Sequence, residues 1–201
     1  MAATARDYTW FTRDFDPVYC ITLIRGLGPR EFLSRIGAEI EPQTRDVAGL
    51  EQLRYEFDGL HHRMPIGATA VLGDGGLWTL GVEWNGFAGV TEEIMRPAST
   101  GTRIVSHFRN ENAADYFHWY EDGEVRLDFE PLFAYSRTGP EADAIAEQMV
   151  ESGFDLRDTE DRTYELHTEA SFALAERLTG VRLTAEVLRE AEFVCGTALL
   201  A

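Results

Sequence analysis

Residues 116–129, YFHWYEDGEVRLDF, have the pattern of a β-hairpin that turns at Asp122-Gly123. Asp-Gly suits a two-residue hairpin loop, which needs a positive φ at both central positions. Such a loop fixes which residues of the two strands face each other. The expected pairs are Tyr120–Val125, His118–Leu127 and Tyr116–Phe129 on one face, and Trp119–Arg126 and Phe117–Asp128 on the other. Both faces of the hairpin therefore carry aromatic side chains.

Further strand patterns precede this hairpin. Residues 18–24 are apolar on both alternating faces, which is typical of a central strand. The turn 73–76 separates two strand-like runs, and residues 102–109 form another. Pro131 discourages a central strand beyond the hairpin, because proline has no N–H for the ladder.

Helical spacing of apolar residues marks the segments outside this region. The expected helices are residues 29–37, 46–57, 142–153, 168–179 and 184–196, with Gly180 between the last two and Thr184 as an N-cap. We expect the α+β class, with a mixed or antiparallel sheet whose hairpins lie in the middle of the chain and are packed by N-terminal and C-terminal helices. The length of 201 residues predicts a single domain over 1–201, strand-rich over 18–131 and helical over 140–198.

Composition and charge exclude several classes of protein. The chain is 44% hydrophobic and 26% charged, which indicates a folded globular protein. Its net charge is −17, and residues 111–170 hold 17 acidic residues against 4 Arg. This charge disfavours nucleic acid and anionic lipid as partners. Cys20 and Cys195 lack a C-x-x-C spacing, and no signal peptide or membrane span is evident, so we expect a reducing cytoplasm.

Several short motifs occur in a suggestive order. They are Trp10-Phe11, residues 19–27, Gly76-Leu77-Trp78, residues 83–89, residues 101–106, Phe129-Glu130-Pro131 and residues 178–184. Together they resemble an uncharacterised family of acidic actinobacterial proteins, filed as a domain of unknown function, over residues 8–190. The resemblance implies a cytoplasmic setting and one compact domain. It supplies no activity, cofactor or catalytic residue.

The sequence contains no recognisable catalytic or metal-binding motif. None of the five histidines forms H-x-x-x-H, and no G-x-S-x-G marks a nucleophile. The glycine-rich turn 73–76 lacks the Lys-Ser/Thr of a phosphate-binding loop and precedes a strand rather than a helix. We therefore expect no catalytic residue, no cofactor and no metal.

The leading hypothesis is a non-catalytic cytosolic protein-interaction module. The hairpin would present Phe117, Trp119, Arg126 and Asp128 as an acidic aromatic sheet surface for a basic protein, with the Trp119–Arg126 pair as an exposed anchor. The non-functional alternative is that this pair is only a cross-strand cation–π contact. By analogy, an antitoxin or immunity-like role fits a small acidic protein. A permanent subunit of a larger complex differs from this hypothesis only in the lifetime of the interface.

The alternative is a small-ligand-binding protein or enzyme with a pocket between sheet and helices. Its candidate residues are Glu83 between two core tryptophans, His107 on a strand face expected to meet solvent, and His118 on the apolar face of the hairpin. The two hypotheses differ in whether the sheet exposes a flat aromatic patch or closes over converging polar groups. The sequence leaves open which face the helices cover, as well as the partner and the oligomeric state.

Overall fold

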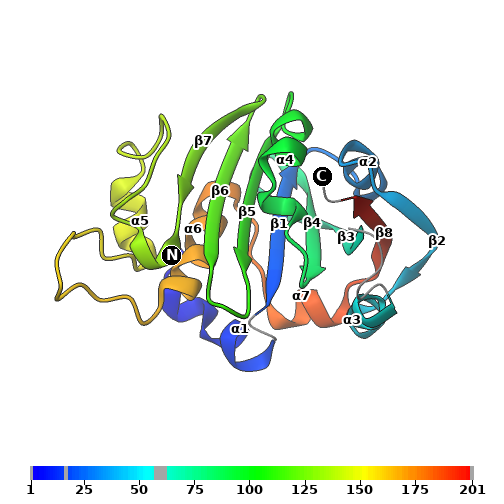
Figure 1. Ribbon diagram of the computed structural model, residues 1–201, viewed down its shortest axis with the longest axis horizontal. Coiled ribbons are helices and arrows are strands. Elements are labelled where there is room, and N and C mark those ends of the chain that lie inside the picture. The colour runs from blue at the N-terminus through cyan, green and yellow to red at the C-terminus, as the bar shows by residue number, and fades with distance from the viewer. Residues whose placement is uncertain (1, 16–17, 57–62, 200–201) are drawn as a thin grey trace.

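The computed structural model describes residues 2–15, 18–56 and 63–199, and its centre is one eight-stranded sheet (Figure 1). In spatial order the strands are β2 (Glu39–Arg45), β8 (Phe193–Leu199), β3 (Arg63–Gly73), β4 (Gly76–Trp84), β1 (Tyr19–Arg25), β5 (Arg103–Arg109), β6 (Asp115–Glu121) and β7 (Glu124–Phe129). All neighbours pair antiparallel. The fold is therefore α+β with an antiparallel sheet, as the sequence predicts.

Helices pack on both faces of this sheet. The α-helices are α1 (Thr9–Asp14), α2 (Pro29–Arg35), α3 (Val47–Glu56), α4 (Glu92–Ala98), α5 (Ala146–Ser152), α6 (His167–Thr179) and α7 (Ala185–Glu190). Three 3-10 helices are η1 (Ala5–Tyr8), η2 (Ala88–Val90) and η3 (Pro131–Phe133). The predicted helix 46–57 corresponds to α3, and Phe57 lies outside the described residues.

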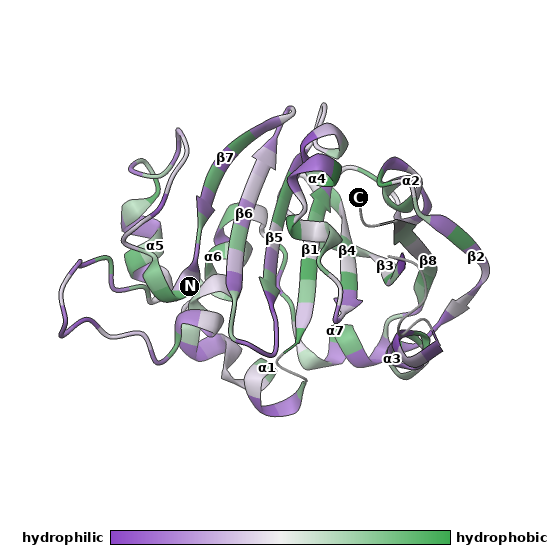
Figure 2. Cartoon of the chain, in the orientation of Figure 1, coloured by the Kyte–Doolittle hydropathy of each residue, from purple (hydrophilic) through white to green (hydrophobic). Residues whose placement is uncertain are grey.

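The central strand is β1, as predicted. Six of its seven residues are buried, because it pairs with β4 and β5 and is covered on both faces. Figure 2 shows β1 mostly in green, the colour of hydrophobic residues. A strand that is buried on both faces cannot alternate polar with apolar residues, so its sequence is a continuous apolar run.

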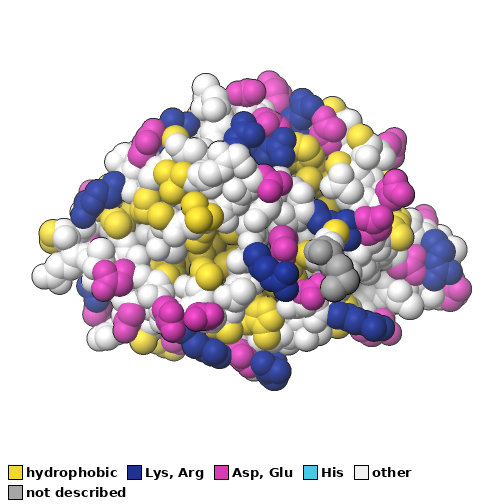
Figure 3. Space-filling model, turned by 180° about the vertical axis from the view of Figure 1, so that it is seen from behind, with side chains coloured by type: hydrophobic (Ala, Val, Ile, Leu, Met, Phe, Trp, Pro, Cys, Tyr) yellow, Lys and Arg dark blue, Asp and Glu magenta, His cyan; other side chains and the backbone are white. Residues whose placement is uncertain are grey.

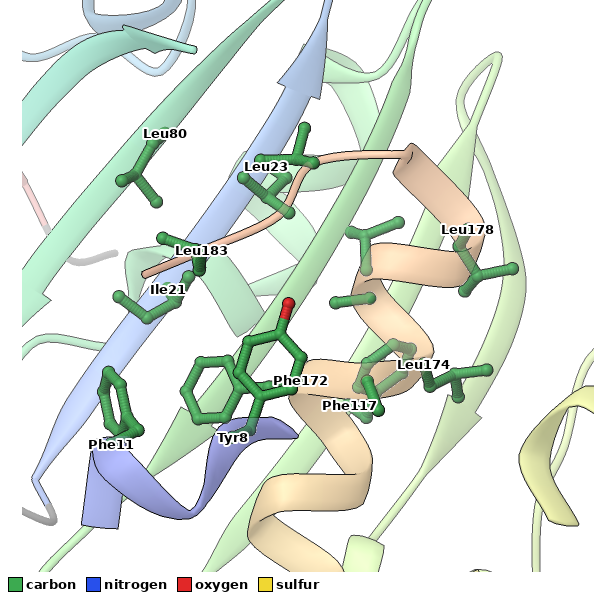
Figure 4. Close-up of a cluster of buried hydrophobic side chains, with 14 of the residues drawn as sticks. Tyr8, Phe11, Ile21, Leu23, Leu80, Phe117, Phe172, Leu174, Leu178 and Leu183 are labelled. Carbon is green, nitrogen blue, oxygen red and sulfur yellow. The ribbon is translucent and has the colours of Figure 1, made fainter. Parts of the chain in front are cut away.

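Two cores lie on opposite faces of the sheet. On one face, Phe172 of α6 contacts Tyr8 and Phe11, with the Phe11 ring centroid 4.3 Å away (Figure 4). The Phe172 ring also contacts the ring of Tyr19. On the other face, α2 and α4 bury residues such as Phe32 and Met95. The view from the α6 side shows Arg and acidic side chains intermingled around hydrophobic patches (Figure 3).

The end of the chain differs from the prediction. The expected helix 184–196 is helical only as α7, which ends at Glu190, and Phe193–Leu199 forms strand β8 between β2 and β3. The helical span 140–198 is therefore wrong in its last part. Cys195 faces one core and Ala198 the other. A short run that is apolar on both sides has the same pattern whether it is a buried strand or a buried helix.

Thr184 caps α7 as predicted, since its Oγ1 accepts a hydrogen bond from the Val187 N–H at 3.1 Å. We expect Thr184→Ala to lower the free energy of unfolding by about 1 kcal/mol, because this N–H loses its acceptor. Urea denaturation measures the change, and Thr184→Ser is the matched control that keeps the hydroxyl. Equal midpoints for the alanine variant and the wild type would contradict the cap.

Candidate functional site

An aromatic groove lies over β5 and β6 on the face that also carries α4, which faces the viewer in Figure 1. Its volume is about 440 Å³, and its lining residues are Phe87, Val90, Phe108, Asn110, Ala114, Tyr116, His118 and Asp128. Phe87 and Tyr116 each keep 42% of their surface exposed. The Phe108 ring stacks on Tyr116 at 6.0 Å between centroids and meets Phe87 edge-on at 6.4 Å. Three rings thus form one wall that is accessible to a ligand.

Asp128 gives the aromatic groove a negative charge. His118 Nε2 lies 3.3 Å from Asp128 Oδ1, and His118 Nδ1 lies 2.7 Å from the Tyr120 hydroxyl. The hydrogen bond from His118 holds the pKa of Asp128 below its ordinary value of 3.8, so this carboxylate is ionised at neutral pH. Burial raises the pKa of Tyr120, and the negative charges of Glu92, Asp128 and Glu93 add to that rise.

A β-bulge in β7 determines which hairpin residues reach the groove. The observed pairs are Tyr120–Val125, as predicted, and then Trp119–Leu127, His118–Asp128 and Phe117–Phe129. The predicted pairs His118–Leu127, Tyr116–Phe129, Trp119–Arg126 and Phe117–Asp128 are therefore wrong. Arg126 is the extra residue, and its carbonyl oxygen accepts the N–H of Glu141. One inserted residue moves Asp128 to the face of His118.

Phe117 and Trp119 are buried, so the prediction that they form an exposed surface is wrong. Their exposed fractions are 0% and 6%, and both belong to the core on the α6 side. The guanidinium carbon of Arg103 lies 4.6 Å from the centre of the Trp119 ring, in the place expected for Arg126. Arg126 forms an ion pair with Glu141 instead. The physical reason is that α5 and α6 cover this face of the hairpin.

A buried hydrogen-bond chain crosses β1, β5 and β6 beneath α6. His107 Nε2 donates to Asp115 Oδ1 at 2.7 Å, and His107 Nδ1 accepts from the Tyr19 hydroxyl at 3.2 Å. The expectation that His107 faces solvent is wrong, because its strand face packs against Phe172 of α6. Burial raises the pKa of Tyr19, and the charge of Asp115 adds to the rise. The Tyr19 hydroxyl therefore stays protonated and acts as the donor.

Glu83 is buried on the opposite face, where it holds the turn η2. Its two carboxylate oxygens accept the N–H groups of Ala88 at 2.9 Å and Gly89 at 3.0 Å. Burial raises the pKa of Glu83 to about 7, although these two hydrogen bonds act in the opposite direction. Because η2 and the residue before it carry Val90 and Phe87 of the aromatic groove, Glu83 is a positioning residue for one groove wall.

Glu83, His107 and His118 occupy three different environments. Glu83 lies beneath η2, His107 beneath α6, and His118 in the aromatic groove. Adjacent residues of a strand point to opposite faces of a sheet, so Phe108 reaches the groove while His107 faces the other core. The structure therefore does not gather these residues into the pocket that the alternative hypothesis predicts.

The described part of the chain has neither a metal-binding cluster nor a membrane-spanning helix. Residues 2–15, 18–56 and 63–199 contain no group of three His, Cys, Asp or Glu side chains placed to hold a metal ion. Over the same ranges no helix has the length and apolar character needed to cross a bilayer. Cys20 and Cys195 are both buried free thiols.

Phe87, Phe108 and Tyr116 were not among the candidate residues from the sequence, although they line the groove. The sequence predicts that Tyr116, His118 and Tyr120 share one apolar face of the hairpin. Of these three residues, only Tyr120 is fully buried. The available signal was the alternation in 102–109, which puts Phe108 on the face opposite His107. Nothing in the local pattern shows that the helices on this face leave Phe108 and Tyr116 uncovered.

A family model described as "Family of unknown function (DUF6461)" matches residues 1–200. The chain belongs to this family. The match confirms the resemblance to a family of unknown function that the order of the short motifs suggests. No curated protein and no solved structure matches the chain.

Proposed function

We propose that this DUF6461 chain is a non-catalytic protein-interaction module that docks a basic segment of a partner protein in the aromatic groove. The observation that carries the proposal is the pair of half-exposed rings, Phe87 and Tyr116, in a groove that also holds the carboxylate of Asp128. Exposed aromatic residues that line a concave surface are typical of binding sites, and Tyr is enriched among the residues that dominate binding energy.

The chemistry of the groove favours an arginine side chain of that partner. A guanidinium can stack on the face of Tyr116 and hydrogen-bond to the Asp128 carboxylate at the same time. Acidic residues outnumber arginines by 17 to 4 over residues 111–170, which include β6 and β7. Such an excess raises the rate at which a basic partner encounters the chain.

The proposed surface differs from the one that the sequence suggests. Asp128 lines the groove, whereas the other three residues of the predicted set, Phe117, Trp119 and Arg126, do not. Tyr116 takes the role that was assigned to Trp119, because the helices cover the other face of the hairpin. The chemistry of an aromatic anchor beside a carboxylate is unchanged.

The cellular setting is part of the proposal. The reduced, buried state of Cys20 and Cys195 fits a reducing cytoplasm. The charge of −17 disfavours nucleic acid and anionic membranes as partners, so a basic protein is the partner that the charge favours. An antitoxin or immunity-like role would use such a surface to cover a basic region of its target.

Fluorescence anisotropy with two labelled peptides tests the proposal. One peptide alternates Arg with Gly, and the other alternates Glu with Gly. We expect the Arg peptide to bind and the Glu peptide not to bind, with binding that weakens as salt rises. Tyr116→Ala and Asp128→Asn should each weaken binding by about tenfold or more, because each removes one of the two contacts.

Two exposed positions provide matched controls. Tyr55 on α3 is 67% exposed and Asp158 lies in an exposed loop, and neither lines the aromatic groove. Tyr55→Ala and Asp158→Asn should therefore bind the Arg peptide as the wild type does. If the groove variants bind as tightly as these controls, the groove is not the docking site.

A further inference from the structure

A second cavity lies on the other face of the sheet, at the N-terminus of α6. It has a volume of about 330 Å³, and its lining residues are Phe11, Thr12, Tyr19, Arg109, Glu165, His167, Thr168 and Glu169. We call it the α6 cavity. Its size is at the lower end of the range for ligand pockets, which suits a small molecule rather than a peptide. It is independent of the aromatic groove, because the two cavities share no lining residue.

One side of the α6 cavity supplies hydrogen-bond donors. Arg109 Nη1 contacts Thr168 Oγ1 and His167 Nε2, the latter at 3.2 Å. The N–H groups on Nη2 and Nε of Arg109 have no hydrogen-bond partner among the described residues. The first turn of the 13-residue helix α6 also begins without a side-chain cap, which leaves the backbone N–H groups of Thr168 and Glu169 available. A guanidinium beside a helix N-terminus fits a carboxylate.

The same cavity holds acceptors close to these donors, which are the carboxylates of Glu165 and Glu169. Asp115 is fully buried behind Arg109 and His167, and its Oδ2 has no hydrogen-bond partner among the described residues. This oxygen lies 3.5 Å from His167 Nε2 and 4.0 Å from Arg109 Nη1. Asp115 does not line the cavity, so this oxygen lies behind the site and is not open to a ligand. Glu169 accepts the Thr12 hydroxyl through Oε1 at 2.6 Å, and Glu165 lies at the exposed end.

The two sets of groups together select the charge of the ligand. A simple anion would suit Arg109 and the α6 terminus but would be repelled by the carboxylates of Glu165 and Glu169. A simple cation would suit the carboxylates but would be repelled by the guanidinium of Arg109. A molecule that carries a carboxylate and an ammonium a few bonds apart satisfies both sets.

We propose that the α6 cavity binds a free α-amino acid through its zwitterionic backbone. The ligand carboxylate lies against Arg109 and the first turn of α6. The ligand ammonium lies toward the carboxylates of Glu165 and Glu169. Asp115 lies behind Arg109, 4.0 Å from its Nη1, and His107 holds the other carboxylate oxygen of Asp115.

Titrations followed by ¹⁵N–¹H NMR test this proposal on the full chain. The probes are the twenty amino acids singly, acetate as the carboxylate alone and methylammonium as the amine alone, each up to about 10 mM to detect a millimolar Kd. We expect at least one amino acid to shift the amides of Thr168 and Glu169 with saturation. Acetate and methylammonium should each bind at least about tenfold more weakly than the best amino acid, since each engages half of the site.

Variants locate the binding. Arg109→Gln should weaken amino-acid binding by about tenfold or more, and Thr168→Val should weaken it several-fold. Arg30→Gln, at an exposed arginine of α2, is the matched control and should bind as the wild type does. If Arg109→Gln fails to fold, Thr168→Val carries the comparison. The proposal is overturned if no amino acid gives saturable shifts, if acetate binds as tightly as the best amino acid, or if both cavity variants bind like Arg30→Gln.

Discussion

Replacing Asp115 with alanine is expected to lower the free energy of unfolding by about 3–5 kcal/mol, because the change leaves buried charged and polar groups without their partner. Asp115 is 0% exposed and accepts the His107 Nε2–H at 2.7 Å. Without the carboxylate, His107 keeps a buried donor with nothing to bond. Arg109 also loses the carboxylate oxygen that lies 4.0 Å from its Nη1.

Urea denaturation of single and double variants measures this effect. His107→Leu removes the donor, so the double variant of Asp115→Ala and His107→Leu should lose less stability than the two single changes together. Asp143→Asn, at a fully exposed carboxyl, is the matched surface control and should stay near the wild type. A loss below about 1 kcal/mol for Asp115→Ala would contradict the buried chain that the structure shows, since removing one partner of a buried pair costs more than that.

Glu83 is expected to make stability depend on pH between about 4.5 and 7. Burial raises its pKa from the ordinary value of 4.5 to about 7, so the folded chain binds this proton more tightly than the unfolded chain. The stabilisation from this proton is complete below pH 4.5 and is lost as the pH rises through about 7. With one pKa unit equal to about 1.4 kcal/mol, the total change is roughly 3 kcal/mol.

The comparison of wild type with Glu83→Gln isolates this contribution. Other carboxyls, such as Asp128, have lowered pKa values and act in the opposite direction, but they titrate alike in both proteins. The difference in unfolding free energy between the two proteins should therefore change across this pH range, with the wild type losing stability relative to the variant as the pH rises. Parallel curves would mean that Glu83 does not titrate there. A change in the NMR signal of Phe87 over the same pH range would link Glu83 to the groove wall.

The strands that sequence reasoning located share a simple physical signature. β1 is a continuous apolar run, β3 and β4 flank a glycine-rich turn, and β6 and β7 flank Asp122-Gly123. In each of these the turn or the burial pattern is encoded by a few neighbouring residues. Gly180, with a left-handed φ at the end of α6, and the Thr184 cap were found for the same reason.

Other elements depend on contacts between distant parts of the chain. β2 contains Pro42 and mostly exposed residues, and it is a strand because β8 pairs with it at the edge of the sheet. β8 is apolar on both faces, so its pattern is shared with a buried helix. These two elements could be assigned only from the tertiary arrangement.

The sequence places the candidate site on the wrong face of the hairpin. Two features cause this error, and both depend on distant parts of the chain. The bulge at Arg126 depends on Glu141, fifteen residues away in sequence, whose N–H bonds to the Arg126 carbonyl. The choice of exposed face depends on where α5 and α6 pack. The residue types were informative nonetheless, because an aromatic ring beside Asp128 is what the structure places in the groove.

The most direct test of the proposed function is a ¹⁵N–¹H NMR titration of the full chain with the Arg-Gly peptide. The account predicts saturable shifts at Phe87, Phe108, Tyr116 and Asp128, with unchanged signals from β2 and α6 and loss of the shifts in Tyr116→Ala. Saturable shifts that map elsewhere on the chain, or shifts at the groove that persist in Tyr116→Ala, would contradict the assignment of the aromatic groove as a docking site for a basic partner.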